Sequence, residues 1–136
     1  MDMKAVNQQV IADFRAGGPI SVDGVHRERI VLLTTTGARS GEPRTVPVMF
    51  RPSENGILVV ASDNGSPRVP RWFRDLVANP AVHVEAPDAE YDARATVLDG
   101  EKRDNVWKRL TSELPMFLEQ QLRAGRELPL IEISRV

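Results

Sequence analysis

Hydrophobic and polar positions along the chain follow the two-residue period of β-strands over much of its length. Residues 44–50 and 91–98 alternate apolar with polar side chains, which is typical of strands with one buried face. Residues 30–36 are apolar and then β-branched, a composition that suits a pleated strand. About six strands are predicted in all, at residues 30–36, 44–50, 57–62, 81–85, 91–98 and 128–134.

Helical spacing of apolar side chains replaces this alternation in three segments. The predicted helices lie at residues 3–15, 70–79 and 101–123. Pro115 must break or kink the third helix, because proline lacks the N–H group that a helix interior needs.

A run of hairpins with few helical interruptions favours an antiparallel sheet that closes into a small barrel. A doubly wound parallel sheet would need a helix after each strand. We therefore expect an α+β fold, mainly β, with peripheral helices and a single domain over residues 1–136. Residues 1–18 form an N-terminal helical segment whose mobility the sequence leaves open. Packing on the body is favoured over membrane contact, because the segment lacks a cationic polar face.

Composition restricts the classes of partner. The formal net charge is −1, so no global field draws the chain to nucleic acid or to an anionic membrane. The sequence has no cysteine, and its two histidines, His26 and His83, stand far apart without clustered partners. No metal site is therefore expected. No apolar run reaches the roughly 18 residues of a spanning helix, and we expect a cytoplasmic location.

The loop between the first two predicted strands concentrates the candidate chemistry. Gly37 and Gly41 bracket this loop, and Arg39 and Arg44 flank it. Guanidinium groups bind phosphate or carboxylate through paired hydrogen bonds, and backbone N–H groups of a turn can add to such a site. The loop therefore indicates an anion site on a hairpin, with an ordinary hairpin carrying solvated arginines as the alternative.

Two later segments could complete a cofactor site. Residues 62–66 are small and polar, so a flat ring could lie against their backbone, and Trp72 in the following helix could cover it. Phosphate donors, backbone donors at the ring edge and apolar cover are what a flat ring with a phosphate tail requires.

The same three segments, residues 32–44, 61–67 and 70–80, closely resemble the motifs of the deazaflavin-dependent nitroreductase family of F420H2-dependent quinone, nitro and enone reductases. The resemblance implies a split β-barrel, coenzyme F420 as cofactor, and hydride transfer from the reduced deazaflavin to an electron-poor small molecule. That acceptor would be a quinone, an enone or a nitro compound. By motif position, the implied cofactor-binding residues are Gly37, Arg39, Ser40, Gly41, Arg44, Ala61, Ser62, Asn64 and Gly65.

The chain departs from the family pattern at positions that bear on function. Ala38 stands where the family often has a second basic residue, and Asp63 stands where it has a basic or neutral one. An acid at Asp63 would weaken an anion site that it faced. The late helix lacks the family's tyrosines, which counts against nitro reduction and leaves the catalytic residues unassigned. The candidates for the acceptor pocket are Trp72, Leu114, Phe117 and Gln120.

Two alternatives to the enzyme remain open at this point. The first is a deazaflavin or lipophile binding protein without turnover, and the second is a related split barrel that binds FMN or haem. The chain is expected to be a monomer or a homodimer.

Overall fold

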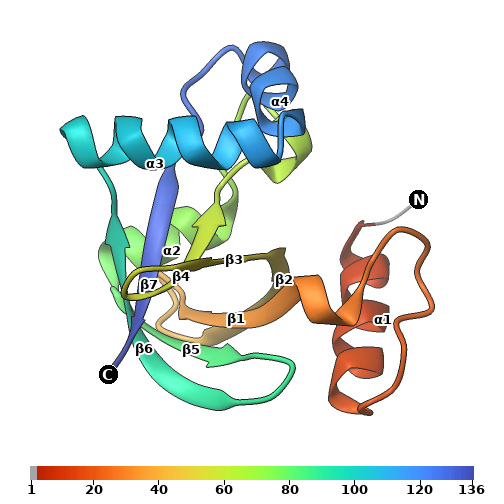
Figure 1. Ribbon diagram of the computed structural model, residues 1–136. Helices are drawn as coiled ribbons and strands as arrows, with labels where there is room; N and C mark the ends of the chain where they lie inside the picture. Colours follow the sequence, from red (N-terminus) through yellow and green to blue (C-terminus); the bar gives the residue numbers. More distant parts are fainter. Residues whose placement is uncertain (1–2) are drawn as a thin grey trace.

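The computed structural model describes residues 3–136, which form a curled seven-stranded antiparallel sheet with helices around it (Figure 1). The strands are β1 (Ile30–Thr36), β2 (Pro43–Met49), β3 (Arg51–Ser53), β4 (Gly56–Val60), β5 (Ala81–Glu85), β6 (Glu90–Val97) and β7 (Leu130–Arg135). The helices are α1 (Met3–Arg15), α2 (Arg71–Ala78), α3 (Gly100–Glu113) and α4 (Met116–Ala124), with the single turns η1 (Arg27–Arg29) and η2 (Asp63–Gly65).

The order of the strands shows why the sheet curls. The sheet runs β2-β1-β5-β6-β7-β4-β3, so β2 and β3 occupy its two edges. Only Phe50 separates these two strands in the sequence, and one residue cannot span a flat sheet of this width. The two edges must therefore approach each other. The predicted mainly β split barrel is confirmed.

Alternating side chains of the strands fill two separate cores. Val31 and Leu33 of β1 lie in the core inside the curl, together with residues of β4 to β7. Ile30 and Leu32 of the same strand pack under α1 with Phe14. Burial of β1 on both faces explains why its sequence is a nearly continuous apolar run rather than an alternating one.

The outer face of β4 and β7 carries a further core beneath α3 and α4. Leu58 and Leu130 lie there against Leu110 and Phe117. The long predicted helix is broken at Pro115, which caps α4, so the expected interruption is confirmed.

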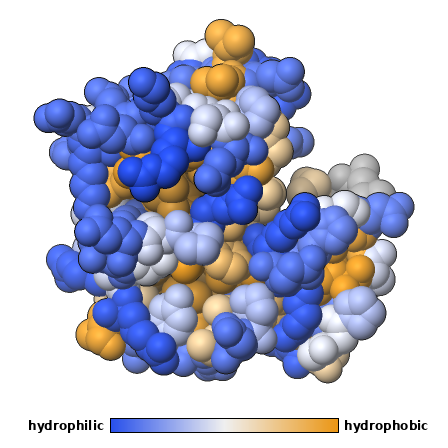
Figure 2. Space-filling view, in the orientation of Figure 1, coloured by the Kyte–Doolittle hydropathy of each residue, from blue (hydrophilic) through white to orange (hydrophobic). Residues whose placement is uncertain are grey.

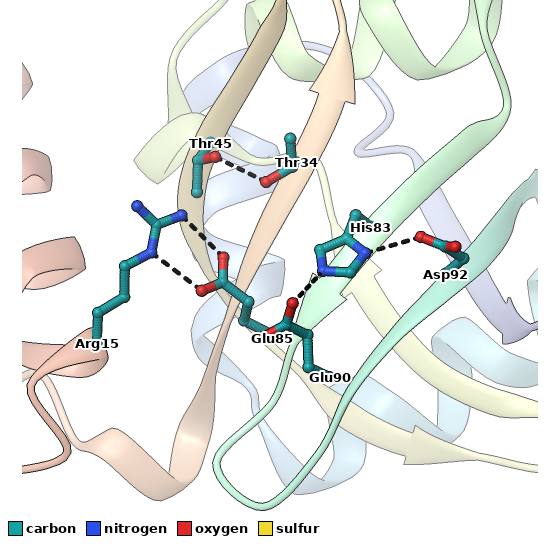
Figure 3. A network of polar contacts seen from close by, with 7 residues as sticks. All are labelled: Arg15, Thr34, Thr45, His83, Glu85, Glu90 and Asp92. Carbon is teal, nitrogen blue, oxygen red and sulfur yellow. Dashed lines mark hydrogen bonds and ion pairs between the residues drawn. The ribbon is translucent and has the colours of Figure 1, made fainter.

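The first helix is fixed to the body by a charged contact as well as by its apolar face. Arg15 donates from Nε and from an Nη atom to the two carboxylate oxygens of Glu85, at 3.0 and 2.9 Å (Figure 3). Most of the predicted segment 1–18 is thus a packed helix, while residues 1 and 2 lie outside the described part of the chain. Across residues 3–136, no helix has the length and apolar character needed to cross a membrane.

The strand β3 is absent from the sequence-based prediction, which placed no strand or helix between residues 50 and 57. Pro52 lies opposite Ile57 in the register of β3 and β4. Proline cannot donate to a ladder, but β3 is an edge strand whose other side has no partner strand. Pro47 likewise lies on an edge strand, since β2 is the other edge of the sheet.

Candidate functional site

The loop from Gly37 to Glu42 closes tightly between β1 and β2. The Gly37 N–H donates to the Glu42 carbonyl at 2.8 Å, and the Gly41 N–H donates to the Gly37 carbonyl at 3.0 Å. Gly41 has a φ of 70°, a backbone conformation that residues other than glycine rarely adopt. A Cβ on Gly37 would collide with the Ser40 hydroxyl. The backbone of the loop therefore requires glycine at residue 41, whereas a side chain at residue 37 would force the Ser40 hydroxyl to move.

A cleft of about 370 Å³ opens beside this loop. We call it the anion cleft; it is lined by Gly37, Ala38, Arg39, Ser40, Arg44, Arg71, Arg74 and Asp75. Arg39, Ser40 and Arg44 meet there as the sequence predicted. The first turns of α2 bring two further guanidinium groups, those of Arg71 and Arg74, which the sequence analysis did not select. Helical spacing of three residues placed both on one face of α2 and was the only signal for them.

Asp75 attaches α2 to the loop. Its carboxylate is 3% exposed, and Oδ1 accepts the Ala38 N–H at 2.9 Å. Its Oδ2 atom is buried without a hydrogen-bond partner. The four guanidinium groups thus face a single carboxylate, so the anion cleft has a net positive charge on the wall of a nearly neutral protein.

A second space of about 320 Å³, which we call the barrel hollow, lies where β2 approaches β4. Its lining residues are Met3, Asn7, Val46, Pro47, Val48, Met49, Val60, Ser62, Asp63, Asn64, Pro70, Trp72, Met116, Phe117 and Gln120. Figure 2 shows hydrophobic surface in the recess between the sheet and the helices α3 and α4. Gln120 lines the hollow, and its Oε1 atom is buried without a hydrogen-bond partner.

The predicted residues divide between those that line the barrel hollow and those that support it. Ser62, Asn64 and the acceptor-pocket candidates Trp72, Phe117 and Gln120 line it. Ala61 and Gly65 are buried behind its wall. Leu114 instead lines a separate void of about 10 Å³ beneath α3, because the chain turns away at Pro115. Asp63 lies at the hollow and is exposed.

The anion cleft and the barrel hollow are adjacent along two elements. On β2, Arg44 lines the cleft, while Val46 and Val48 line the hollow. These residues share one face of the strand, so the charged and apolar ends are about 13 Å apart. At the start of α2, Arg71 lines the cleft and Trp72 lines the hollow. An elongated ligand with an anionic tail and a flat apolar head matches this arrangement.

A larger cleft of about 570 Å³ lies between α3 and the β3–β4 hairpin. Its cations, Arg51, Lys102 and Arg109, face a similar number of carboxylates. None of the motif residues reaches it. No group of three or more potential metal ligands occurs in residues 3–136.

Comparison with known proteins assigns the chain to a family. Residues 7–133 match the family described as F420H(2)-dependent quinone reductase. The chain belongs to this family. An F420H(2)-dependent quinone reductase of Mycobacterium tuberculosis is 29% identical over 108 residues, which cover 77% of this chain and 72% of the relative.

Solved structures agree with this assignment. An F420-H2 dependent reductase, FDR-A, is 41% identical with a TM-score of 0.68, and the match covers 82% of this chain and all of the other. A structure described as a domain-swapped dimer is 36% identical with a TM-score of 0.70, over 97% and 98% of the two chains. The haem storage protein HutZ of Vibrio cholerae shares the fold alone, at 18% identity and a TM-score of 0.57, covering 93% and 87%. The predicted deazaflavin-dependent reductase with coenzyme F420 as its cofactor is confirmed at the level of the family.

Proposed function

We propose that the chain catalyses hydride transfer from reduced F420 to a quinone, with the phosphate of the cofactor in the anion cleft and its ring in the barrel hollow. The observation that carries this proposal is the continuity of the two spaces along β2, from Arg44 to Val48. The residues fit the group: guanidinium groups stand where the phosphate would lie, and apolar walls stand where the ring would lie.

When bound, the reduced deazaflavin supplies the hydride. The contribution of the protein is to place ring and acceptor face to face and to exclude water from the space between them. Val48, Trp72 and Phe117 provide the apolar walls for this purpose. Gln120 also lines this space, and an amide side chain there can form a hydrogen bond with a hydroxyl group of the reduced product.

The ionisable groups that line the barrel hollow favour a quinone over a nitro compound as acceptor. Its described lining contains no tyrosine, histidine or lysine, and its only acid, Asp63, is exposed. Reduction of a quinone to a hydroquinone takes one hydride and one proton, which solvent at the open mouth can deliver. A nitro group takes more than one hydride and further protons and loses water, so it depends more on a positioned acid.

The test is to mix reduced F420 with the purified protein and menadione, and to follow the return of the oxidised ring absorbance. Turnover with menadione, and slower turnover with cyclohexenone and a nitroimidazole, is the expected result. Tight binding of F420 without oxidation of the reduced cofactor by any quinone would refute the proposed enzymatic activity and would favour a cofactor-binding protein without turnover.

A further inference from the structure

Arg126 follows α4 and binds the backbone of the loop that forms one wall of the barrel hollow. Its Nε donates to the Ser66 carbonyl at 3.0 Å. Its terminal nitrogens donate to the carbonyls of Ala61 at 3.3 Å, Ser62 at 3.2 Å and Arg68 at 3.1 Å. One guanidinium group therefore fixes the direction of four peptide units in residues 61–68.

Arg123, one turn earlier on α4, acts on the same loop. Its Nη2 donates to the Asn64 carbonyl at 3.2 Å. Its side chain also covers Gly65, whose φ is 81°; a Cβ there would lie 2.7 Å from the Arg123 Nε. Gly65 is thus favoured by its left-handed backbone conformation, and the absence of a side chain lets Arg123 lie against it.

Two consecutive residues of the loop have left-handed backbone conformations. Asp63 and Asn64 have φ values of 46° and 54°, in a region that non-glycine residues seldom occupy, although Asp and Asn enter it more readily than the others. Two such residues in succession still need surrounding contacts to hold them. The contacts with Arg123 and Arg126 supply that constraint.

The direction of the carbonyl groups sets the direction of the N–H groups. In a trans peptide unit, the N–H points opposite to the preceding C=O. Because the Ala61 and Ser62 carbonyls point at Arg126, the N–H groups of Ser62 and Asp63 point away from it. Both residues line the barrel hollow, and neither N–H donates to another backbone group within residues 3–136.

We propose that Arg126, assisted by Arg123, is a positioning residue that aims the Ser62 and Asp63 N–H groups at a carbonyl oxygen on the edge of the bound deazaflavin ring. The guanidinium charge behind the two carbonyls polarises the same peptide units and strengthens both donors. This inference rests on the proposed function, because the ring is the group that the donors would meet. The segment around α4 then has two roles. The first turn of α4 lines the hollow, and Arg123 and Arg126, at and just after its end, fix the loop that forms the opposite wall.

The first experiment measures the loop without any cofactor. Amide hydrogen exchange of the ligand-free protein should show the Gly65 and Ser66 amides exchanging at least about 10-fold faster in Arg126→Gln, with core amides of β1 unchanged. Arg109→Gln, which removes the same charge from an exposed site on α3, is the control and should change neither. Unchanged exchange in Arg126→Gln would overturn the proposal.

The second experiment uses two ligands, F420 and a deazaflavin that carries the ribityl chain without phosphate. Arg126→Gln should weaken the binding of both by a similar factor, about 10-fold for two lost hydrogen bonds, and shift the bound ring's absorption toward that of the free ring. Arg44→Gln should weaken only the phosphate-bearing ligand. Equal binding of the phosphate-free compound by wild type and Arg126→Gln would overturn the positioning role.

Two further variants keep the test decisive. If Arg126→Gln does not fold, Arg126→Lys serves instead, because it retains the charge but lacks the planar guanidinium group. Arg126→Lys should lose part of the ligand affinity and of the amide protection. Wild-type affinity and protection in this variant would overturn the proposal. Arg123→Gln should give a smaller loss of the same kind. If the wild-type protein binds neither ligand, the proposed function and the ring contact both fail, whereas the exchange experiment still decides whether Arg126 orders the loop.

Discussion

Arg44→Gln tests the anion cleft most directly. Arg44 is half-buried on β2, whereas Arg39, Arg71 and Arg74 are exposed. Behind it lies Gly37, whose added Cβ would come within 3.5 Å of the Arg44 Nε, so the arginine packs against the loop. A hydrogen bond to a charged group in such a position contributes about 1.5–3 kcal/mol. F420 should therefore bind about 10- to 150-fold more weakly to Arg44→Gln.

The exposed arginines of the anion cleft should contribute less to F420 binding than the half-buried Arg44. Ion pairs on the surface contribute about 0.2–1 kcal/mol and are screened by salt, so Arg74→Gln should weaken F420 binding by only about 2- to 5-fold. Fluorescence titration of F420 at low and at moderate ionic strength measures both variants, with Arg109→Gln as the matched control. Equal losses for Arg44→Gln and Arg74→Gln, or no loss for Arg44→Gln, would refute the idea that burial determines which guanidinium dominates.

Three more outcomes follow from single contacts. Asp75→Asn keeps an oxygen for the loop N–H but removes the buried charge whose Oδ2 has no partner, so F420 should bind several-fold more tightly in the same titration. Hydrogen bonds from the His83 ring to the carboxylates of Asp92 and Glu90 raise the pKa of His83 (Figure 3). These hydrogen bonds therefore stabilise the folded protein fully below the unfolded pKa of histidine, about 6.5, and this stabilisation is lost as the pH rises through the raised pKa of folded His83. The variant His83→Gln should remove this pH dependence of the melting temperature. Ile133→Ala empties a fully buried position and should cost about 2–5 kcal/mol in urea unfolding; a loss below about 1 kcal/mol would contradict the inner core.

The sequence predicted the strands well where the chain is buried on both faces or alternates cleanly. The bounds of β1 and β5 agree with the predicted residues 30–36 and 81–85, because each apolar run ends at glycine, proline or a charged residue. β3 was missed because three residues that include Pro52 carry no periodic pattern. Its existence depends on pairing with β4, which is a contact rather than a local preference.

Residues of the site could be selected from the sequence only where glycines and charged residues lie close together in one segment. The loop with Arg39 and Arg44 is marked by adjacent glycines and charges. Arg71 and Arg74 reach the same cleft only because Asp75 attaches α2 to that loop, and a buried hydrogen bond of this kind has no signal in the sequence. Ala38, where the family often has a basic residue, lines the same cleft as Arg71 and Arg74, so guanidinium groups from another element add positive charge there.

In the proposed function, the groups that bind the cofactor differ from the side chains that line the space for the acceptor. On the proposed function, the ring would meet peptide N–H groups held in place by Arg123 at the end of α4 and by Arg126 just after it, and the phosphate would meet guanidinium groups from β2 and α2. These polar contacts use neither Phe117 nor Gln120, which line the remaining wall of the barrel hollow. On the proposed function, the absence of the family's tyrosines from that wall would change which acceptor is accommodated without removing a polar group that binds the cofactor. Specificity for the acceptor and affinity for the cofactor are then separable, because they depend on different elements of the fold.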